Sequence, residues 1–203
     1  MHPRIYREFE RICTERGAGG AVLEVGAVPC EQSLLCMRAL DHATEKVGLN
    51  LDGPYEFRDF KIVRGNANAM TCFADNRFDV VLSNAMLEHD KHFWKTLAEL
   101  KRVLRPGGLL VIGVPAFEYF PVEKIKRALA RLPLVRSLQK NQHLNMLFTA
   151  TITYELHNAP GDYYRFSRQA CEEVIFAELD EVEIHSVMLP PRLVGAGRKA
   201  RSS

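Results

Sequence analysis

The first 115 residues alternate short apolar runs with segments whose apolar residues recur at helical spacing. Runs that are apolar on both faces and are separated by helices or tight connections are typical of parallel strands covered on both sides. The pattern therefore predicts a doubly wound, mostly parallel α/β sheet with helices on both faces. The predicted strands are "AVLEV" (21–25), "EKVGLNLD" (45–52), "FKIVRGNA" (60–67), "FDVVLSNA" (78–85) and "LLVIGVP" (109–115).

Three helices are predicted around these strands, at residues 4–16, 33–40 and 90–105. Apolar residues of the first share one face, and we expect this helix to pack on the edge of the domain. The last is the clearest, because its apolar residues repeat at helical intervals, Asp90 can cap its N-terminus and "RPGG" at 105–108 can end it.

The second half of the chain departs from this alternation. Residues 116–158 contain amphipathic stretches, which predict a helical insertion over the carboxyl ends of the strands. Residues 159–197 are expected to form a helix and two edge strands joined at the prolines 190–191. Together with a ligand-binding core over 21–115, these parts are expected to form one domain, residues 1–203, because this length suits a single hydrophobic core.

Composition is that of an ordinary globular chain and narrows the choice of partners. Of 203 residues, 47% are hydrophobic and 26% charged, and the formal net charge is +2. Nucleic acid is an unlikely partner at this charge. The N-terminus "MHPRIYREFERICTERG" lacks the apolar region of a secretory signal, and no apolar run reaches the length of a membrane span. These features predict a cytoplasmic protein without a transmembrane segment.

The five cysteines are irregularly spaced and form no CxxC pair. Such a set argues against a disulfide framework and against a zinc site. We therefore expect reduced, mostly buried thiols and no bound metal.

The first predicted strand runs into Glu24 and Gly26, at the edge of the sheet where doubly wound folds bind their ligands. A glycine there lets the backbone turn tightly and approach a ligand, and a carboxylate can bind amino or hydroxyl groups. A dinucleotide site would continue as GxGxxG, but Val28 and Cys30 stand where further glycines are expected. A pyrophosphate site is therefore disfavoured.

Several motifs in order, "VGLNLD", "GNANA", "FDVVLSNAMLEH" and "ELKRVLRPGGLLVIGVP", resemble the class I S-adenosylmethionine-dependent methyltransferases over roughly Ala21 to Pro115. The later "APGDYYRFSRQACEEVI" is similar to a segment that follows the cofactor domain in small methyltransferases acting on glycans, lipids or small metabolites. The resemblance implies a Rossmann-like fold and S-adenosylmethionine as cofactor. It also implies methyl transfer to oxygen or nitrogen of a small-molecule, glycan or lipid-linked acceptor.

The same resemblance implies which residues hold the cofactor. Glu24 and Gly26 would lie in the first cofactor loop, beside the methionine part of S-adenosylmethionine. The carboxylate for the ribose hydroxyls should end the second strand, where Asn50 and Asp52 point the same way in an extended chain. We favour Asp52 as the charged partner, with Asn50 helping.

Two further asparagines complete the implied cofactor site. Asn66 stands at the family's usual acid near adenine, and its amide can still pair with the adenine edge. Asn84, after the fourth strand, would line the methyl-donor end. Its alternative role is to satisfy backbone groups in the turn.

A general base is needed mainly when the methyl acceptor is a hydroxyl. Candidates are His89 at the rim and His157 in "YELHNAPGDYYRF", with Asp162 able to orient or replace a histidine. Each has a plainer alternative, because His89 can be an exposed residue at a helix start and His157 can be satisfied by loop backbone.

Residues 122–140 are strongly basic, with six lysines and arginines against Glu123 alone. A basic amphipathic helix can make a peripheral contact with an anionic surface or bind an acidic substrate, although a solvated face over an apolar underside is the commoner case. The alternative to an enzyme is a non-catalytic binding or scaffold protein of the same fold, whose basic insertion contacts a partner.

Overall fold

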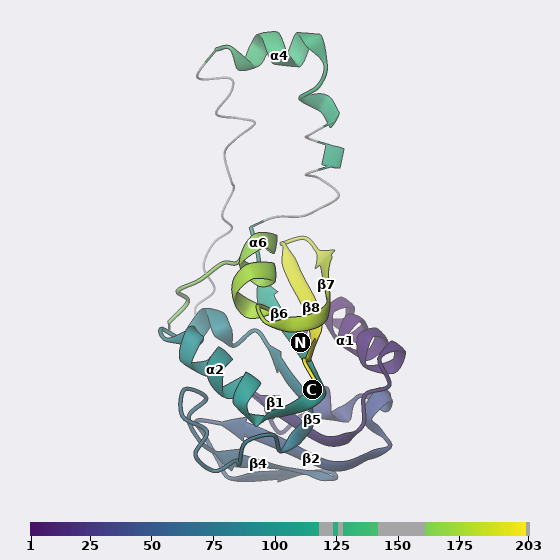
Figure 1. Ribbon diagram of the computed structural model, residues 1–203, viewed down its shortest axis with the longest axis vertical. Helices are drawn as coiled ribbons and strands as arrows, with labels where there is room; N and C mark the ends of the chain where they lie inside the picture. The colour runs from purple at the N-terminus through teal and green to yellow at the C-terminus, as the bar shows by residue number, and fades with distance from the viewer. Residues whose placement is uncertain (118–123, 126–127, 142–160, 202–203) are drawn as a thin grey trace.

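Eight strands form one mixed sheet in the computed structural model of the chain, which describes residues 1–117, 124–125, 128–141 and 161–201 (Figure 1). In space the strands follow the order β3-β4-β2-β1-β5-β6-β8-β7. Their bounds are β1 Gly20–Val25, β2 Ala43–Asn50, β3 Tyr55–Phe57, β4 Phe60–Arg64, β5 Phe78–Asn84, β6 Leu104–Pro115, β7 Leu179–Met188 and β8 Arg192–Lys199.

The five central strands, β4, β2, β1, β5 and β6, are parallel to one another. β3 runs antiparallel to β4, and β8 runs antiparallel to both β6 and β7. This arrangement confirms the predicted doubly wound, mostly parallel sheet. The chain leaves β1 toward β2 on one side and reaches β5 on the other, so the carboxyl ends of β1 and β5 form the switch point where such sheets bind ligands.

Helices cover both faces of the sheet (Figure 1). One face is covered by α1 and two short 3-10 turns, η1 and η2, whereas α2, α6 and the single π-helical turn η4 cover the other. The bounds are α1 Pro3–Glu15, η1 Leu34–Cys36, η2 Arg38–Leu40, α2 Phe93–Val103, α6 Arg168–Ala170 and η4 Cys171–Ile175.

The position of α1 corrects the expectation that this helix packs on the edge of the domain. Phe9 is fully buried, and a side chain at Gly113 of β6 would come within 2.9 Å of its ring. The helix therefore lies directly on a face of the sheet, where Ile5 and Ile12 join the core. Gly113 has no side chain, and this allows α1 to pack closely against β6.

Two predicted helices are shorter than expected. In place of one helix over 33–40, η1 and η2 are separated by Met37, whose ψ of 137° is extended and cannot continue a helix. The helix expected from Asp90 begins at Phe93, because the φ of −119° and the ψ of 39° at His92 are not helical. The stretch "RPGG" (105–108) belongs to β6. β3 was not predicted at all.

The described part of the predicted insertion contains α4, Pro133–Gln139, which Figure 1 shows apart from the sheet and its covering helices. The two C-terminal strands predicted around the prolines 190–191 are β7 and β8, but only β7 lies at an edge of the sheet, because β8 pairs with both β6 and β7. Among the residues that the structure describes, no helix is long and apolar enough to cross a membrane. The division into a core over 21–115, an insertion and a C-terminal part stays a prediction.

Candidate functional site

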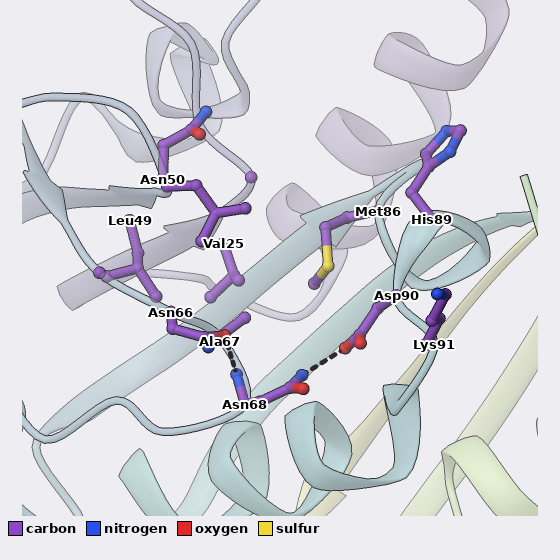
Figure 2. Close-up of a pocket in the computed structure, with 13 residues that line it drawn as sticks. Val25, Leu49, Asn50, Asn66, Ala67, Asn68, Met86, His89, Asp90 and Lys91 are labelled. Atoms are coloured by element: carbon purple, nitrogen blue, oxygen red, sulfur yellow. Dashed lines mark hydrogen bonds between the residues drawn. The ribbon is translucent and has the colours of Figure 1, made fainter. Parts of the chain in front are cut away.

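A pocket of about 210 Å³ opens beside the switch point, at the carboxyl ends of β1, β2 and β4 (Figure 2). Its far wall is formed by the chain after β5, which includes the 3-10 turn η3, Leu87–His89. Apolar and amide side chains make up most of the surface. The lining residues are Val25, Gly26, Leu49, Asn50, Leu51, Gly65, Asn66, Ala67, Asn68, Met86, His89, Asp90 and Lys91.

Gly26 turns the chain at the end of β1 and lines the pocket. Its φ is +88°, a conformation that side chains rarely adopt, and its N–H donates to Leu49 O at 2.9 Å. An added Cβ would lie 3.3 Å from Met86 Cγ on the opposite wall. A glycine is therefore required both for the turn and for the width of the pocket.

Glu24 lies on the other face of the sheet and does not line the pocket. Its carboxylate is buried and accepts hydrogen bonds from Ser33 Oγ and, at 3.4 Å, from Leu35 N. Burial raises the pKa of Glu24, although these hydrogen bonds act in the opposite direction. In the described structure, the carboxylate fixes the start of η1 against β1.

The raised pKa of Glu24 predicts a pH-dependent stability that Glu24→Gln removes. Because the folded state holds this proton more tightly, the free energy of unfolding falls as pH rises from the unfolded value, about 4.3, to the higher folded value. Thermal unfolding across this range should show a weaker fall for Glu24→Gln than for the wild type. Glu56→Gln, at an exposed site on β3, is the control, and equal slopes for all three proteins would contradict the prediction.

Asn84 also lies away from the pocket. It ends β5 and pairs in register with Gly113, whose Cα it approaches closely enough that a Cβ there would lie 2.4 Å from Asn84 Oδ1. Phe9 of α1 approaches the same point from the helix. The structure therefore places Asn84 on the α1 face, whereas the pocket opens toward the α2 face.

Of the two residues proposed at the end of β2, Asn50 lines the pocket and Asp52 does not. Asn50 Nδ2 donates to Ala27 O at 2.7 Å and Asn50 Oδ1 accepts from Asp52 N at 3.2 Å. These bonds tie the loop after β1 to the loop after β2. Asp52 is exposed, and Leu51 between them forms part of the rim.

Asn66 and Asn68 follow β4 and form one side of the pocket (Figure 2). Asn66 Oδ1 accepts from Asn68 N at 2.9 Å, which closes a tight turn. Asn68 Nδ2 donates to Asp90 Oδ2 at 2.6 Å and to Thr96 Oγ1 at 2.8 Å. The Asn68 amide is thereby held in one orientation by two residues from the opposite side of the site.

Asp90 joins both sides of the pocket. Besides the bond from Asn68, the Asp90 carboxylate accepts hydrogen bonds from Thr96 Oγ1 at 2.7 Å and from His92 N at 2.8 Å. Sequence reasoning assigned Asp90 only to the helix cap and did not include Asn68 in the site. The available signal for Asn68 was its place in "GNANA", two residues after Asn66.

His89 ends η3 and lines the pocket. Its Nδ1 lies 3.0 Å from Gly161 O. Since a carbonyl oxygen only accepts, this contact requires the proton on Nδ1 and makes Nε2 the basic nitrogen of the neutral ring. The fully buried Glu88 places Oε1 4.0 Å from His89 Nε2 and 3.5 Å from Arg192 Nη1. The carboxylate is therefore positioned to stabilise a protonated His89.

The other candidates for catalysis are placed differently. Asp162 is buried, and both of its oxygens accept hydrogen bonds from Arg165, one of them at 2.6 Å. Its carboxylate is thus bound by a guanidinium in the described structure. His157 lies outside the described residues. Among the described residues, no group of three or more metal-binding side chains is placed to hold an ion.

Comparison with known sequences identifies a methyltransferase domain model that matches residues 29–112. An uncharacterized methyltransferase of Mycobacterium avium strain 104 is 33% identical over 107 residues, which are 49% of this chain and 41% of that protein. The chain thus matches about two fifths of the length of this curated relative.

Solved methyltransferase structures share the fold over nearly the whole chain. The 1,6-didemethyltoxoflavin-N1-methyltransferase of Burkholderia thailandensis, solved with 1,6-didemethyltoxoflavin and S-adenosylhomocysteine, is 18% identical with a TM-score of 0.62, covering 96% of this chain and 78% of that chain. The N-methyltransferase NodS of Bradyrhizobium japonicum is 12% identical with a TM-score of 0.61, covering 97% and 95%.

Proposed function

We propose that the chain is a class I S-adenosylmethionine-dependent methyltransferase that transfers the methyl group of this cofactor to oxygen or nitrogen of a small-molecule, glycan or lipid-linked acceptor. The methyltransferase domain model that matches residues 29–112 and the fold shared with solved methyltransferases support the proposal. The observation that carries the proposal is the pocket at the switch point, which joins the loops after β1, β2 and β4 to the chain after β5. Doubly wound sheets bind their ligands at this position.

The residues of the pocket fit S-adenosylmethionine. This cofactor has a purine, a ribose and a charged methionine part but no phosphate, and Gly26 leaves room for close backbone approach. Leu49, Leu51 and Met86 would cover the flat purine, and the amides of Asn66 and Asn68 would supply polar contacts at its edge.

Asn50 is the proposed partner of the ribose hydroxyls, in the place where the family carries an acid. The amide can accept and donate, and the bond from its Nδ2 to Ala27 O leaves Oδ1 as the acceptor. Since Asp52 N also uses this oxygen, a hydroxyl would share it or replace that bond. In this proposal the two roles expected from the sequence are exchanged, because Asp52 would support Asn50 through the hydrogen bond from Asp52 N to Asn50 Oδ1.

The cofactor supplies a methyl group on a sulfonium, which is already activated for in-line displacement. The chain's part is to bind, orient and, for a hydroxyl acceptor, to remove a proton. His89 is the proposed base, because it lines the pocket and its Nδ1 contact with Gly161 O leaves Nε2 basic. Glu88 would stabilise the imidazolium that forms, at 4.0 Å from Nε2.

Two of the structural neighbours are described as N-methyltransferases, which supports nitrogen as one acceptor atom. With an amine acceptor, methyl transfer would depend less on His89 as a base, because a neutral amine is itself nucleophilic. An acceptor screen should therefore include amines and hydroxyl compounds, with S-adenosylhomocysteine release as the signal.

Titration calorimetry with S-adenosylmethionine and S-adenosylhomocysteine is the direct test of the cofactor site. Micromolar binding, on the order of −8 kcal/mol, is expected. A folded protein that binds neither compound would contradict the proposal and favour the non-catalytic binding or scaffold function instead.

A pair of variants tests the ribose assignment. Asn50→Ala removes a side chain that lines the pocket and bridges two loops, so cofactor affinity should fall by about tenfold or more, the value of one or two lost hydrogen bonds. Asp52→Ala keeps the backbone N–H that bonds to Asn50 Oδ1, so its effect should stay within about threefold. Calorimetry measures the cofactor affinity of both variants. If Asp52→Ala lost more affinity than Asn50→Ala, Asp52 would be the residue that binds the ribose.

A further inference from the structure

The described part of the insertion, residues 124–125 and 128–141, exposes an unusual number of large apolar side chains. Their exposed fractions are 61% for Ile125, 46% for Leu129, 50% for Leu132, 72% for Leu134 and 42% for Leu138. Single exposed apolar residues are ordinary, but five within one short segment form a patch of the kind that marks an interaction site.

The same segment is purely cationic. It contains Lys124, Arg131, Arg136 and Lys140 and, within the described residues, neither an acid nor an ion pair to any of these four. Elsewhere in the chain acids and bases are interspersed, as in α1, where Arg11 pairs with Glu8 and Glu15. This excess of positive charge favours an anionic partner.

The two kinds of side chain are separated on α4. Leu134 and Leu138 are four residues apart and lie on one side, while Arg136 and Lys140 are also four apart and lie on the other. Figure 1 shows α4 held away from the sheet, so that both sides are open to a partner.

We propose that residues 124–125 and 128–141 dock on the surface of an anionic lipid bilayer. The leucines would enter the boundary between headgroups and acyl chains, and the four cations would contact the lipid phosphates. This inference rests on the exposed surface alone and is independent of the proposed methyl transfer. A second copy of the chain is a poorer occupant, because it would bring two cationic segments together. The helix would lie on the membrane, since no described helix is long enough to cross one.

Co-flotation with vesicles tests the proposal on the full chain. Partition into vesicles with about 30% phosphatidylglycerol should exceed partition into phosphatidylcholine vesicles at least tenfold and should fall at high salt. The double variant Leu134→Glu/Leu138→Glu should lose binding at least tenfold. Arg136→Glu/Lys140→Glu should lose it by a similar factor, because each surface cation contributes about fivefold.

Matched controls carry the same changes elsewhere. Val174→Glu alters a 46% exposed apolar residue on η4, and Arg7→Glu reverses an exposed cation on α1; both should bind vesicles as the wild type does. Circular dichroism and cofactor titration would verify that every variant is folded.

Three outcomes would overturn the proposal. The first is equal partition into anionic and neutral vesicles, and the second is unchanged partition of both double variants. The third is a dimer in analytical ultracentrifugation that depends on Leu134 and forms in a protein that leaves vesicles unbound. That result would assign the patch to a second copy of the chain.

Discussion

Gly26→Val should weaken S-adenosylmethionine binding by about a hundredfold. Valine is strained at the φ of +88° that the turn requires, and its side chain would project toward Met86, 3.3 Å from where a Cβ would lie. The backbone strain, about 1–3 kcal/mol, and the smaller pocket both affect the loop after β1. The hydrogen bond from Gly26 N to Leu49 O, at 2.9 Å, holds this loop to β2. Calorimetry at a temperature where the variant is folded measures the loss.

Gly19→Val is the matched control. Gly19 precedes β1, and an added Cβ there would meet nothing within 4 Å. Its affinity for the cofactor should equal that of the wild type. If Gly26→Val bound the cofactor as tightly as this control, the cofactor would have to lie outside the pocket described above.

His89→Asn should reduce turnover of a hydroxyl acceptor by about 10²–10⁴-fold, the usual contribution of a general base. The asparagine Nδ2 can still donate to Gly161 O, which His89 Nδ1 contacts at 3.0 Å, so the local chain should keep its position. An amide cannot take up the proton. The cofactor affinity should change by no more than a few fold, which separates loss of a base from loss of the pocket.

A second histidine gives the matched control for His89. His42→Asn, at an exposed site before β2, should retain the wild-type rate. A loss of less than tenfold in His89→Asn would remove His89 as the base.

The positions of the parallel strands along the chain and their burial could be predicted because they depend on local pattern. Runs such as "FDVVLSNA" are apolar on both faces, and the α/β alternation indicates a parallel sheet covered on both sides. The helix boundaries could not be predicted, because they depend on contacts with residues that are distant in the sequence. The helix expected over 33–40 starts with Ser33 bound to the buried Glu24 but is broken at the extended Met37. Asp90, expected to cap the next helix, binds Asn68 from another segment, and α2 begins only at Phe93.

The candidate site shows the same limit. Gly26, Asn50 and Asn66 could be found from motifs, and all three line the pocket. The side of the sheet on which Asn84 lies was available from alternation, because Leu82, two residues earlier, packs in the core under α1. The bond between Asn68 and Asp90 was not available, since it joins segments 22 residues apart.

The ends of the segment between β6 and α6 are fixed side by side. Ala116 pairs with Phe166, and Phe166 N donates to Pro115 O at 3.0 Å. Tyr163 N donates to Glu88 O at 2.7 Å and holds the returning chain to η3. The chain therefore leaves the sheet after β6 and returns to it before α6 at one place, so the positions of these two elements do not depend on the distance that the chain covers between them.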